Sequence, residues 1–406
     1  MGMRLDLRQI VYVLSDALDL VGVDDVQHGK RVAYMARVIA AEMGLPAADL
    51  DDLVHAGLFH DCGVSSTKEH RNLAGSLDWD GEEAHCRRGE SLVAAFAPLA
   101  PLAPVIRWHH AHVKDHPGLE ASPRDLLLAN LVYLADRIDV LVAQAGDRDV
   151  LLAREGIRQV IRENRGTRFD ARAVDAFLEV SGHEAFWLTL EPRALGPFLG
   201  RLARQHADRD LSVEELHQLA VVFATIVDAK SPFTAQHSVR VAAVAQALAD
   251  AAGIDGERRG LVGVAGLLHD LGKLRVPDAI LDKPGALDGG ERVRITRHAF
   301  DTWQILSRID GFEEIACWAA YHHEWVKGGG YPFGIGGEGL SPEARILAVA
   351  DVFQALRQER PYRGRMPVGR ALEHIDAMVA SRHLDGDVAG LLHRDLDACE
   401  AAATGL

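Results

Sequence analysis

The chain contains the stretch HSVRVAAVAQALADAAGI at residues 237–254 and a close copy of it, HGKRVAYMARVIAAEMGL, at residues 28–45. Both stretches begin with HxxRVA, continue in small residues and end in Gly-Leu or Gly-Ile. Self-similarity of this kind indicates an internal repeat. The fold is therefore expected to contain two copies of one unit.

The residues that follow the two stretches keep the same spacing. His60 lies 32 positions after His28, and His269 lies 32 positions after His237. The segments around the later histidines read AGLFHDCG and AGLLHDLG, so an aspartate follows each of them directly. Polar residues matched over such distances indicate a duplicated domain.

A second matched spacing lies further along each half. His85 and His298 each precede a pair of adjacent histidines by 24 positions, and an aspartate inside an apolar run closes each half. The first half thus holds His28, His60, Asp61, His85, His109, His110 and Asp136. The second half holds His237, His269, Asp270, His298, His322, His323 and Asp351.

Helical periodicity dominates the sequence, whereas strand-like alternation is scarce. In residues 212–229 the apolar positions recur at three and four, and Ser212 with Glu215 forms a capping box. That apolar stripe consists of Val213, Leu216, Leu219, Phe223 and Ile226. We predict an all-α fold of two tandem helical bundle domains, residues 1–205 and 206–406, divided within the charged stretch 201–212.

Composition excludes several classes of protein. The 59 acidic residues outnumber the 44 basic ones, and a formal net charge of −15 argues against binding a nucleic-acid polymer. No apolar run is long enough to span a bilayer, and the N-terminus lacks the apolar core of a signal peptide, so we expect a cytoplasmic protein. The four cysteines are scattered without CxxC spacing, which argues against a disulfide framework and against a cysteine zinc site.

The seven repeated side chains of each half are suited to metal ions. A lone histidine in a helix is usually a surface or hydrogen-bonded core residue, but several imidazoles buried among apolar residues carry a desolvation cost unless something binds them. Imidazole and carboxylate suit divalent iron, manganese and zinc, and neither repeated set includes a thiolate. Seven ligands exceed the four of one zinc site, so we predict two ions per half. Two adjacent ions can clamp an attacking hydroxide and polarise a phosphoryl oxygen.

The second half resembles an HD-GYP domain, a branch of the HD metal-dependent phosphohydrolases, from about Asp228 to Met366. The resemblance rests on HSVRV, HDLGK (269–273), His298, HHE (322–324), GGGYP (328–332) and ADVFQALRQERPYR (350–363). The first half resembles the same HD fold more weakly, because it keeps the set of histidines and aspartates but has no GYP.

This resemblance implies a metal-dependent phosphodiesterase that hydrolyses cyclic di-GMP, or a related cyclic dinucleotide, to linear pGpG or GMP. The histidines and aspartates would hold two iron or manganese ions, in the second half and in the first as well. Asp270 and Lys273 would be catalytic, with Lys273 stabilising a phosphate oxygen or assisting the leaving group. Arg360 and Arg363 would grip phosphates, and Tyr331 would lie beside the substrate, on a loop that needs glycine to fold tightly.

The chain departs from the HD-GYP pattern at several positions. In the second half these are Lys327 for Asp or Asn, Gln354 for an acidic residue, Thr302 for a smaller residue, and Phe233 where some relatives have a third-metal glutamate. The first half has Val64 in place of Lys273, keeps Asp139 at the position of Gln354, and has Asp24 where a third metal is conceivable. Each half thus keeps one member of a lysine and aspartate pair that could handle protons. We therefore expect a catalytic second half and a regulatory or differently hydrolytic first half.

Several alternatives stay open. One or both sites could hold metal and a cyclic dinucleotide without turnover, or the chain could be an HD phosphohydrolase that acts on another nucleotide such as cyclic GMP-AMP. A homodimer through residues 212–229 or a signalling protein partner is compatible with the sequence, although such a stripe more often packs within its own chain. Lys114 and Arg137 could read phosphate or be solvated charges. Cys62 and Cys86 adjoin predicted ligands, where packing is favoured over redox tuning of a ferrous site.

Overall fold

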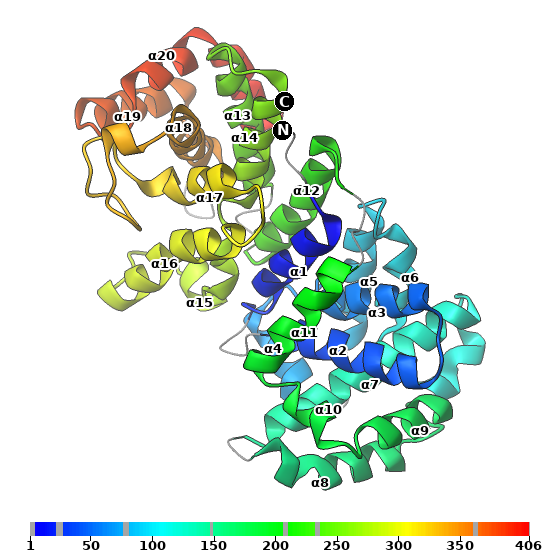
Figure 1. Ribbon diagram of the computed structural model, residues 1–406. Coiled ribbons are helices and arrows are strands. Elements are labelled where there is room, and N and C mark those ends of the chain that lie inside the picture. Colours follow the sequence, from blue (N-terminus) through cyan, green and yellow to red (C-terminus); the bar gives the residue numbers. More distant parts are fainter. Residues whose placement is uncertain are drawn as a thin grey trace. The chain divides into compact units, whose positions relative to one another are not determined.

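The computed structural model describes residues 5–21, 27–75, 81–146, 149–205, 210–231, 236–359 and 364–405. Within these ranges every named element is a helix (Figure 1), and strand pairing is limited to isolated bridges. The prediction of an all-α fold is confirmed. None of the described helices is both long enough and apolar enough to cross a membrane.

The chain divides into two compact units, which we call the N-terminal unit, residues 14–209, and the C-terminal unit, residues 210–406 together with the described residues before 14. Helix α1, Leu7–Leu18, crosses the boundary between the two units that lies between residues 13 and 14. The other helices of the N-terminal unit are α2 His28–Glu42, α3 Ala47–Phe59, α4 Thr67–Gly75, α5 Glu82–Ala94, η1 Ala100–Leu102, α6 Ala103–Trp108, η2 Val113–Gly118, α7 Pro123–Gln144, α8 Val150–Glu163, α9 Ala171–Val180, α10 Glu184–Leu188 and α11 Pro192–Gln205.

The C-terminal unit repeats the order of helices that carries the predicted ligands. Its helices are α12 Val213–Ala229, α13 His237–Ala251, α14 Gly256–Leu268, η3 Leu271–Arg275, α15 Asp278–Leu281, α16 Gly289–Leu306, α17 Glu313–Ala320, η4 Tyr321–His323, η5 Gly337–Gly339, α18 Pro342–Arg357, α19 Val368–Ala380, α20 Gly386–Arg394 and α21 Leu396–Thr404. Helix α13 packs against α14 and α18, as α2 packs against α3 and α7 in the N-terminal unit.

Helix α12 begins as the sequence predicts. The Ser212 side chain accepts a hydrogen bond from the Glu215 amide, and the Glu215 side chain accepts one from the Ser212 amide. Leu216, Leu219 and Phe223 are buried, and α12 packs on α14 of the same chain. The apolar stripe is thus used inside the chain, which was the alternative that the sequence favoured over dimerisation.

Close helix crossings explain why small residues recur in both halves. A Cβ atom on Gly266 would lie 2.8 Å from the Cα of Ala242, and one on Gly57 would lie 2.6 Å from the Cα of Ala33. Backbone cannot yield to such contacts, so only glycine lets the paired helices approach this closely. The repeated RVA and AGL segments are therefore the two sides of one contact, which brings the first two histidines of each set together.

A remote aspartate holds the start of each helix that bears the first histidine. In the C-terminal unit, Asp228 accepts hydrogen bonds from the Ser238 amide at 3.1 Å and the Ser238 hydroxyl at 2.9 Å. In the N-terminal unit, Asp19 accepts one from the Gly29 amide at 3.1 Å. These carboxylates satisfy amides that a helix N-terminus leaves without partners in the helix. Sequence analysis missed both aspartates, although each precedes its histidine by nine positions.

The buried Asp228 carboxyl predicts a dependence of stability on pH. Burial raises its pKa from 3.8 to about 6, although His237 and Ser238 act in the opposite direction. Between these two pH values the folded state binds more protons than the unfolded state. The protonated Asp228 therefore stabilises the folded protein less and less as pH rises through that window. For metal-free protein, we expect the melting temperature of Asp228→Asn to gain on that of the wild type from about pH 4 to about pH 6, with no further gain above about pH 7.

Calorimetry across this pH range tests the prediction. Asp255→Asn makes the same substitution at the exposed N-cap of α14 and serves as the control. A constant difference in melting temperature between Asp228→Asn and the wild type at every pH would contradict the prediction.

Candidate metal centres

Asp270 lies at the centre of the C-terminal cluster, at the end of α14. Its Oδ2 lies 3.5 Å from His237 Nε2 and 3.2 Å from His269 Nε2. Its Oδ1 lies 3.4 Å from His298 Nε2 and 3.9 Å from His322 Nε2. The two oxygens of one carboxylate therefore face two different groups of imidazoles. This is the arrangement by which a carboxylate bridges two cations.

Asp61 repeats this arrangement in the N-terminal unit. Its Oδ2 lies 3.8 Å from His28 Nε2 and 3.5 Å from His60 Nε2. Its Oδ1 lies 3.6 Å from His85 Nε2 and 3.9 Å from His109 Nε2. The donor geometry of both halves thus accommodates two ions.

The remaining predicted ligands complete the two clusters. Asp351 Oδ1 lies 3.4 Å from His237 Nε2, and Asp136 Oδ1 lies 3.5 Å from His28 Nε2. The second histidine of each adjacent pair joins the third histidine of its set, in the groups His298, His322, His323 and His85, His109, His110. The structure therefore gathers all fourteen predicted ligands into two clusters, and their role as ligands stays a prediction.

Backbone carbonyls orient the inner histidines. The Nδ1 atoms of His269, His298 and His322 lie 2.6 to 2.7 Å from the carbonyl oxygens of the residues three positions before them. A hydrogen bond from Nδ1 to a carbonyl leaves the Nε2 lone pair for a metal ion. The same contacts hold His60 and His109 in the N-terminal unit. Both clusters therefore direct Nε2 atoms toward their central aspartate.

Burial and charge set the protonation states of the C-terminal cluster. His237 is buried, which lowers its pKa, yet its contacts with Asp270 and Asp351 raise that pKa to about 10. Burial lowers the pKa of His298 to about 3 and that of His323 to about 4, so both are neutral at pH 7. Burial alone would raise the pKa of Asp270, but His269 and Lys273 hold it well below its ordinary value. Within the described residues, His269 Nε2 and Asp270 Oδ1 are buried without a hydrogen-bond partner. A divalent cation fits such a set, because it would satisfy lone pairs that the protein leaves open.

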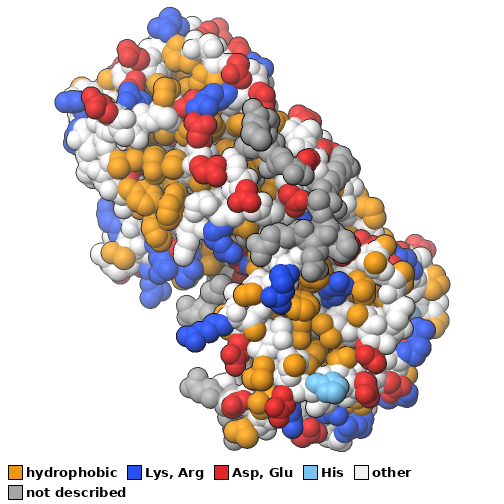
Figure 2. Space-filling view, viewed as in Figure 1, with side chains coloured by type: hydrophobic (Ala, Val, Ile, Leu, Met, Phe, Trp, Pro, Cys, Tyr) orange, Lys and Arg blue, Asp and Glu red, His pale blue; other side chains and the backbone are white. Residues whose placement is uncertain are grey.

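Histidine hardly reaches the face of the molecule drawn in Figure 2, although the chain contains 20 histidines. The ligand sets agree with that view. Their side chains are buried except for His28, Asp61 and His323, which are half-buried.

Lys273 distinguishes the two centres. Its ammonium group pairs with Asp270 Oδ2, the oxygen that faces His237 and His269. The matching position of the N-terminal unit holds Val64, which is buried and apolar. The C-terminal centre thus has a positive charge on its central carboxylate where the N-terminal centre has none.

Gln354 and Asp139 perform the same structural task. Gln354 Oε1 lies 2.6 Å from His237 Nδ1, and Asp139 Oδ2 lies 2.7 Å from His28 Nδ1. Asp139 also accepts a hydrogen bond from Arg31. Each residue therefore orients the first histidine of its set, so exchanging carboxylate for amide tunes a ligand rather than leaving a contact unmade.

This contact predicts a change in metal affinity. Gln354→Ala removes the partner of His237 Nδ1 and is expected to weaken metal binding at the C-terminal centre by about 10- to 100-fold. Gln354→Glu restores the carboxylate of the N-terminal unit and is expected to bind metal at least as tightly as the wild type. Competition with a chromogenic chelator measures both variants. Equal metal affinity of Gln354→Ala and the wild type would show that Gln354 does not support the C-terminal centre.

The GGGYP loop closes over the C-terminal cluster. Glu324 Oε1 accepts hydrogen bonds from the amides of Phe333 at 2.6 Å and Gly334 at 3.0 Å, which folds the loop back on itself. A Cβ on Gly330 would lie 2.5 Å from the Cα of Glu324, so glycine is required there. The Tyr331 ring lies with its centroid 4.7 Å from that of His323. The tight fold expected for this loop is found, and it brings Tyr331 to the cluster.

Other departures from the HD-GYP pattern also have structural explanations. The Thr302 hydroxyl accepts a hydrogen bond from the Gly272 amide and donates one to the His269 carbonyl, so it fixes the HD segment. Lys327 is exposed, and its ammonium lies 5.2 Å from the centre of the Trp325 ring. The predicted Arg360 and Arg363, like Asp24 and Phe233, lie outside the described residues.

The N-terminal centre adjoins a cavity of about 210 Å³. Arg137 lines it and places Nη2 2.6 Å from Asp136 Oδ2. Arg137 is only 1% exposed, so it is not a solvated surface charge, whereas Lys114 is exposed. The other lining residues are His28, Asp61, His70, Leu73, Asp136, Asp139, Val140 and Ala143.

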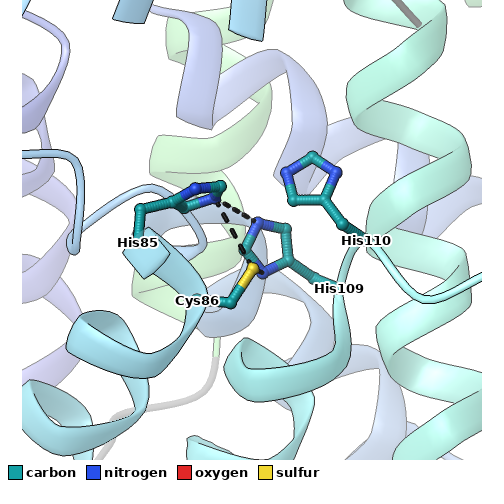
Figure 3. Close-up of side chains that lie close together, drawn as sticks. All are labelled: His85, Cys86, His109 and His110. Carbon is teal, nitrogen blue, oxygen red and sulfur yellow. Dashed lines mark hydrogen bonds between the residues drawn. The ribbon is translucent and has the colours of Figure 1, made fainter. Parts of the chain in front are cut away.

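The N-terminal cluster also contains a sulfur atom, that of Cys86, for which sequence analysis favoured packing over a role at the metal. Figure 3 shows Cys86 beside His85 and His109, with its Sγ 3.7 Å from His85 Nε2. Its position directly after His85 was the signal in the sequence, but the repeat gave no support because Cys86 has no counterpart in the other half.

Comparison with known proteins places both halves in one class of domain. Residues 221–388 and residues 26–141 each match a family model described as HD domain. The 3'3'-cGAMP-specific phosphodiesterase 1 of Vibrio cholerae is 36% identical over 97% of this chain and 92% of that protein. The cyclic di-GMP phosphodiesterase response regulator RpfG of Xanthomonas campestris is 34% identical over 47% of this chain and 50% of that protein.

A solved structure is similar over both halves. It is the crystal structure of a cyclic GMP-AMP specific phosphodiesterase of V. cholerae, V-cGAP3, with a TM-score of 0.67 and 25% identity. The match covers 97% of this chain and 98% of that one.

Proposed function

This chain belongs to the HD-domain family, and on that premise we propose that it is a metal-dependent phosphodiesterase that hydrolyses a cyclic dinucleotide at the C-terminal centre. The observation that carries the proposal is the position of Asp270, whose two oxygens face two groups of imidazoles while Lys273 contacts one of them. The similarity to known phosphodiesterases and the donor geometry both support phosphodiester chemistry.

The residues of the C-terminal centre have separate roles. The seven predicted ligands would hold two divalent ions, and Asp270 would bridge them. When bound, such ions polarise a phosphoryl oxygen and lower the pKa of water. Lys273 would place positive charge where the phosphate or the leaving oxygen becomes negative. Tyr331, next to His323, would lie beside the substrate, and Arg360 and Arg363 remain proposed phosphate contacts.

The donor atoms narrow the choice of metal, and similarity to known enzymes narrows the choice of substrate. A donor set of imidazole and carboxylate without sulfur suits iron or manganese. A relative that spans nearly the whole of this chain is specific for 3'3'-cGAMP, whereas the cyclic di-GMP enzyme RpfG matches about half of the chain. We therefore include 3'3'-cGAMP beside cyclic di-GMP as a substrate, with pGpG or GMP as the products from the latter.

The N-terminal centre is proposed to bear metal without hydrolysing the phosphodiester. Val64 leaves it without the cation that Lys273 supplies. A regulatory role for this unit agrees with that difference. The cytoplasmic location and a homodimer or signalling partner also remain proposals.

A product time course tests the proposed function. Anaerobically purified protein loaded with iron or manganese is incubated with each cyclic dinucleotide and analysed by chromatography. We expect linear product from the wild type and from the His109→Ala, His110→Ala variant, but none from His322→Ala, His323→Ala. Absence of product from fully loaded wild type would contradict the proposal and favour a binding protein.

A further inference from the structure

Cys86 points its sulfur into the N-terminal histidine cluster (Figure 3). Its Sγ lies 3.7 Å from His85 Nε2 and 3.7 Å from His109 Nδ1. His109 Nδ1 faces the Ile106 carbonyl at 2.7 Å, so the other nitrogen of this ring is left for the cluster. One potential ligand atom from each of Cys86, His85, His109 and His110 lies within 4.8 Å of all the others.

The cluster also contains buried nitrogen atoms that make no hydrogen bond, although His110 Nδ1 lies 3.6 Å from Glu82 Oε2. Within the described residues, both ring nitrogens of His110 and the Nδ1 of His85 make no hydrogen bond. His110 is 6% exposed, His85 0% and Cys86 2%. Burying such polar atoms is costly unless a ligand satisfies them. The thiol therefore lies in a cluster whose ring nitrogens remain able to bind a metal ion. A cysteine that served packing alone would not need such neighbours.

The distances suit a tetrahedral ion with mixed donors. Bonds of about 2.0 Å to nitrogen and about 2.3 Å to sulfur separate two nitrogens by about 3.3 Å, and a nitrogen from a sulfur by about 3.6 Å. The Nε2 atoms of His85 and His109 are 3.3 Å apart, and Cys86 Sγ is 3.7 Å from His85 Nε2. Both separations are therefore close to those of donors around one ion.

The C-terminal unit provides an internal comparison. His298 Nε2 and His322 Nε2 are also 3.3 Å apart, so the two histidine pairs have the same separation. The residue after His298 is Ala299, which is fully buried and has no donor atom. Sulfur is therefore the difference in donor type between the two clusters.

We propose that Cys86 is a thiolate ligand of the metal position formed by His85, His109 and His110, which we call the outer position of the N-terminal centre. This position would select a divalent ion of the Zn²⁺ or Co²⁺ class. On binding, the sulfur–metal bond forms as the S–H bond breaks, and the proton leaves to solvent. Thiolate favours these softer ions over manganese, whereas the described residues of the C-terminal cluster offer nitrogen and oxygen donors alone. The inference rests on the proposed histidine ligands of the N-terminal unit and is independent of cyclic dinucleotide hydrolysis.

Cobalt substitution tests this ligand optically. The full chain carrying His322→Ala and His323→Ala, which disables the outer C-terminal position, is titrated with Co²⁺ under anaerobic conditions. We expect a near-ultraviolet thiolate-to-cobalt charge-transfer band that saturates at one ion per chain. Cys86→Ala should lose the band and weaken Zn²⁺ binding at this centre by at least about tenfold.

Two matched variants complete the test. Cys86→Ala reproduces the Ala299 arrangement of the other unit, and circular dichroism checks that it folds. Cys62→Ala removes a neighbouring buried thiol and should keep the band. Ala299→Cys, in a chain that retains His322 and His323 but carries Cys86→Ala, should create a band at the C-terminal centre. Cobalt binding without a band, or a band that survives Cys86→Ala, would overturn the proposal and leave the phosphodiesterase proposal untouched.

Discussion

Replacing Asp270 by asparagine is expected to lower kcat/KM for the cyclic dinucleotide by about 10³-fold or more, which corresponds to about 4 kcal/mol of transition-state stabilisation. The reason is the position of its carboxylate, whose Oδ2 faces His237 and His269 while Oδ1 faces His298 and His322. An amide keeps the shape but loses the negative charge and one of the two oxygen donors. Neither ion would then have its shared ligand.

Metal analysis and kinetics together decide this prediction. Asp270→Asn should contain fewer ions per chain than the wild type after loading and desalting. Asp61→Asn makes the same change at the matching position of the N-terminal unit and should lose metal there while keeping phosphodiester hydrolysis. Wild-type turnover by Asp270→Asn would contradict the assignment of the catalytic centre. Equal losses of hydrolysis in the two variants would instead show that both units take part in it.

The sequence predicts the clusters well because the repeat exposes them. Twelve of the fourteen histidines and aspartates fall into two blocks of matched spacing, and the helices bring each set together around its central aspartate. The reason is physical: helix lengths and the Gly57 and Gly266 crossings must be retained for the set to converge. Spacing along the chain therefore carries information about a three-dimensional site when the site has been duplicated.

What the sequence could not predict consists of contacts between distant segments and of features that only one half possesses. The hydrogen bond between Gln354 and His237 joins residues 117 positions apart, and nothing in the composition of either helix indicates it. Cys86 has no counterpart in the other half, so the repeat could not reveal it. Asp19 and Asp228 do share the repeat, yet an aspartate nine residues before a helix is not a local capping signal.

Besides the exchange between Gln354 and Asp139, the two centres differ by three substitutions around a common frame. The C-terminal centre has Lys273 on its central carboxylate, whereas the N-terminal centre has Val64 there. The N-terminal centre has Arg137 on its last aspartate, where Val352 follows Asp351 in the C-terminal unit. Together with Cys86, these differences alter charge and donor type but leave the imidazole frame intact. The predicted ligands are therefore the same in both units, whereas the charges around them differ.

Lys273→Ala is expected to lower kcat by about 10²- to 10³-fold with little change in KM, because a charge placed on the developing negative oxygen acts mainly in the transition state. Metal binding should be retained or become tighter, since the Lys273 ammonium pairs with Asp270 Oδ2 and competes with a cation for that oxygen. The two readouts separate the roles open to this lysine. A rise in KM with unchanged kcat would indicate that Lys273 binds the substrate rather than the transition state.

Lys283→Ala is the matched control, because this lysine pairs with Glu291 and lies outside the set of predicted ligands. It should leave kcat and metal content unchanged. Lys273→Arg keeps the charge but not its compact shape, so partial activity in that variant would support a role for charge. Unchanged turnover in Lys273→Ala would remove Lys273 from the mechanism. Loss of metal from it would instead make Lys273 a support for the centre, and the absence of lysine beside Asp61 would then no longer explain an inactive N-terminal unit.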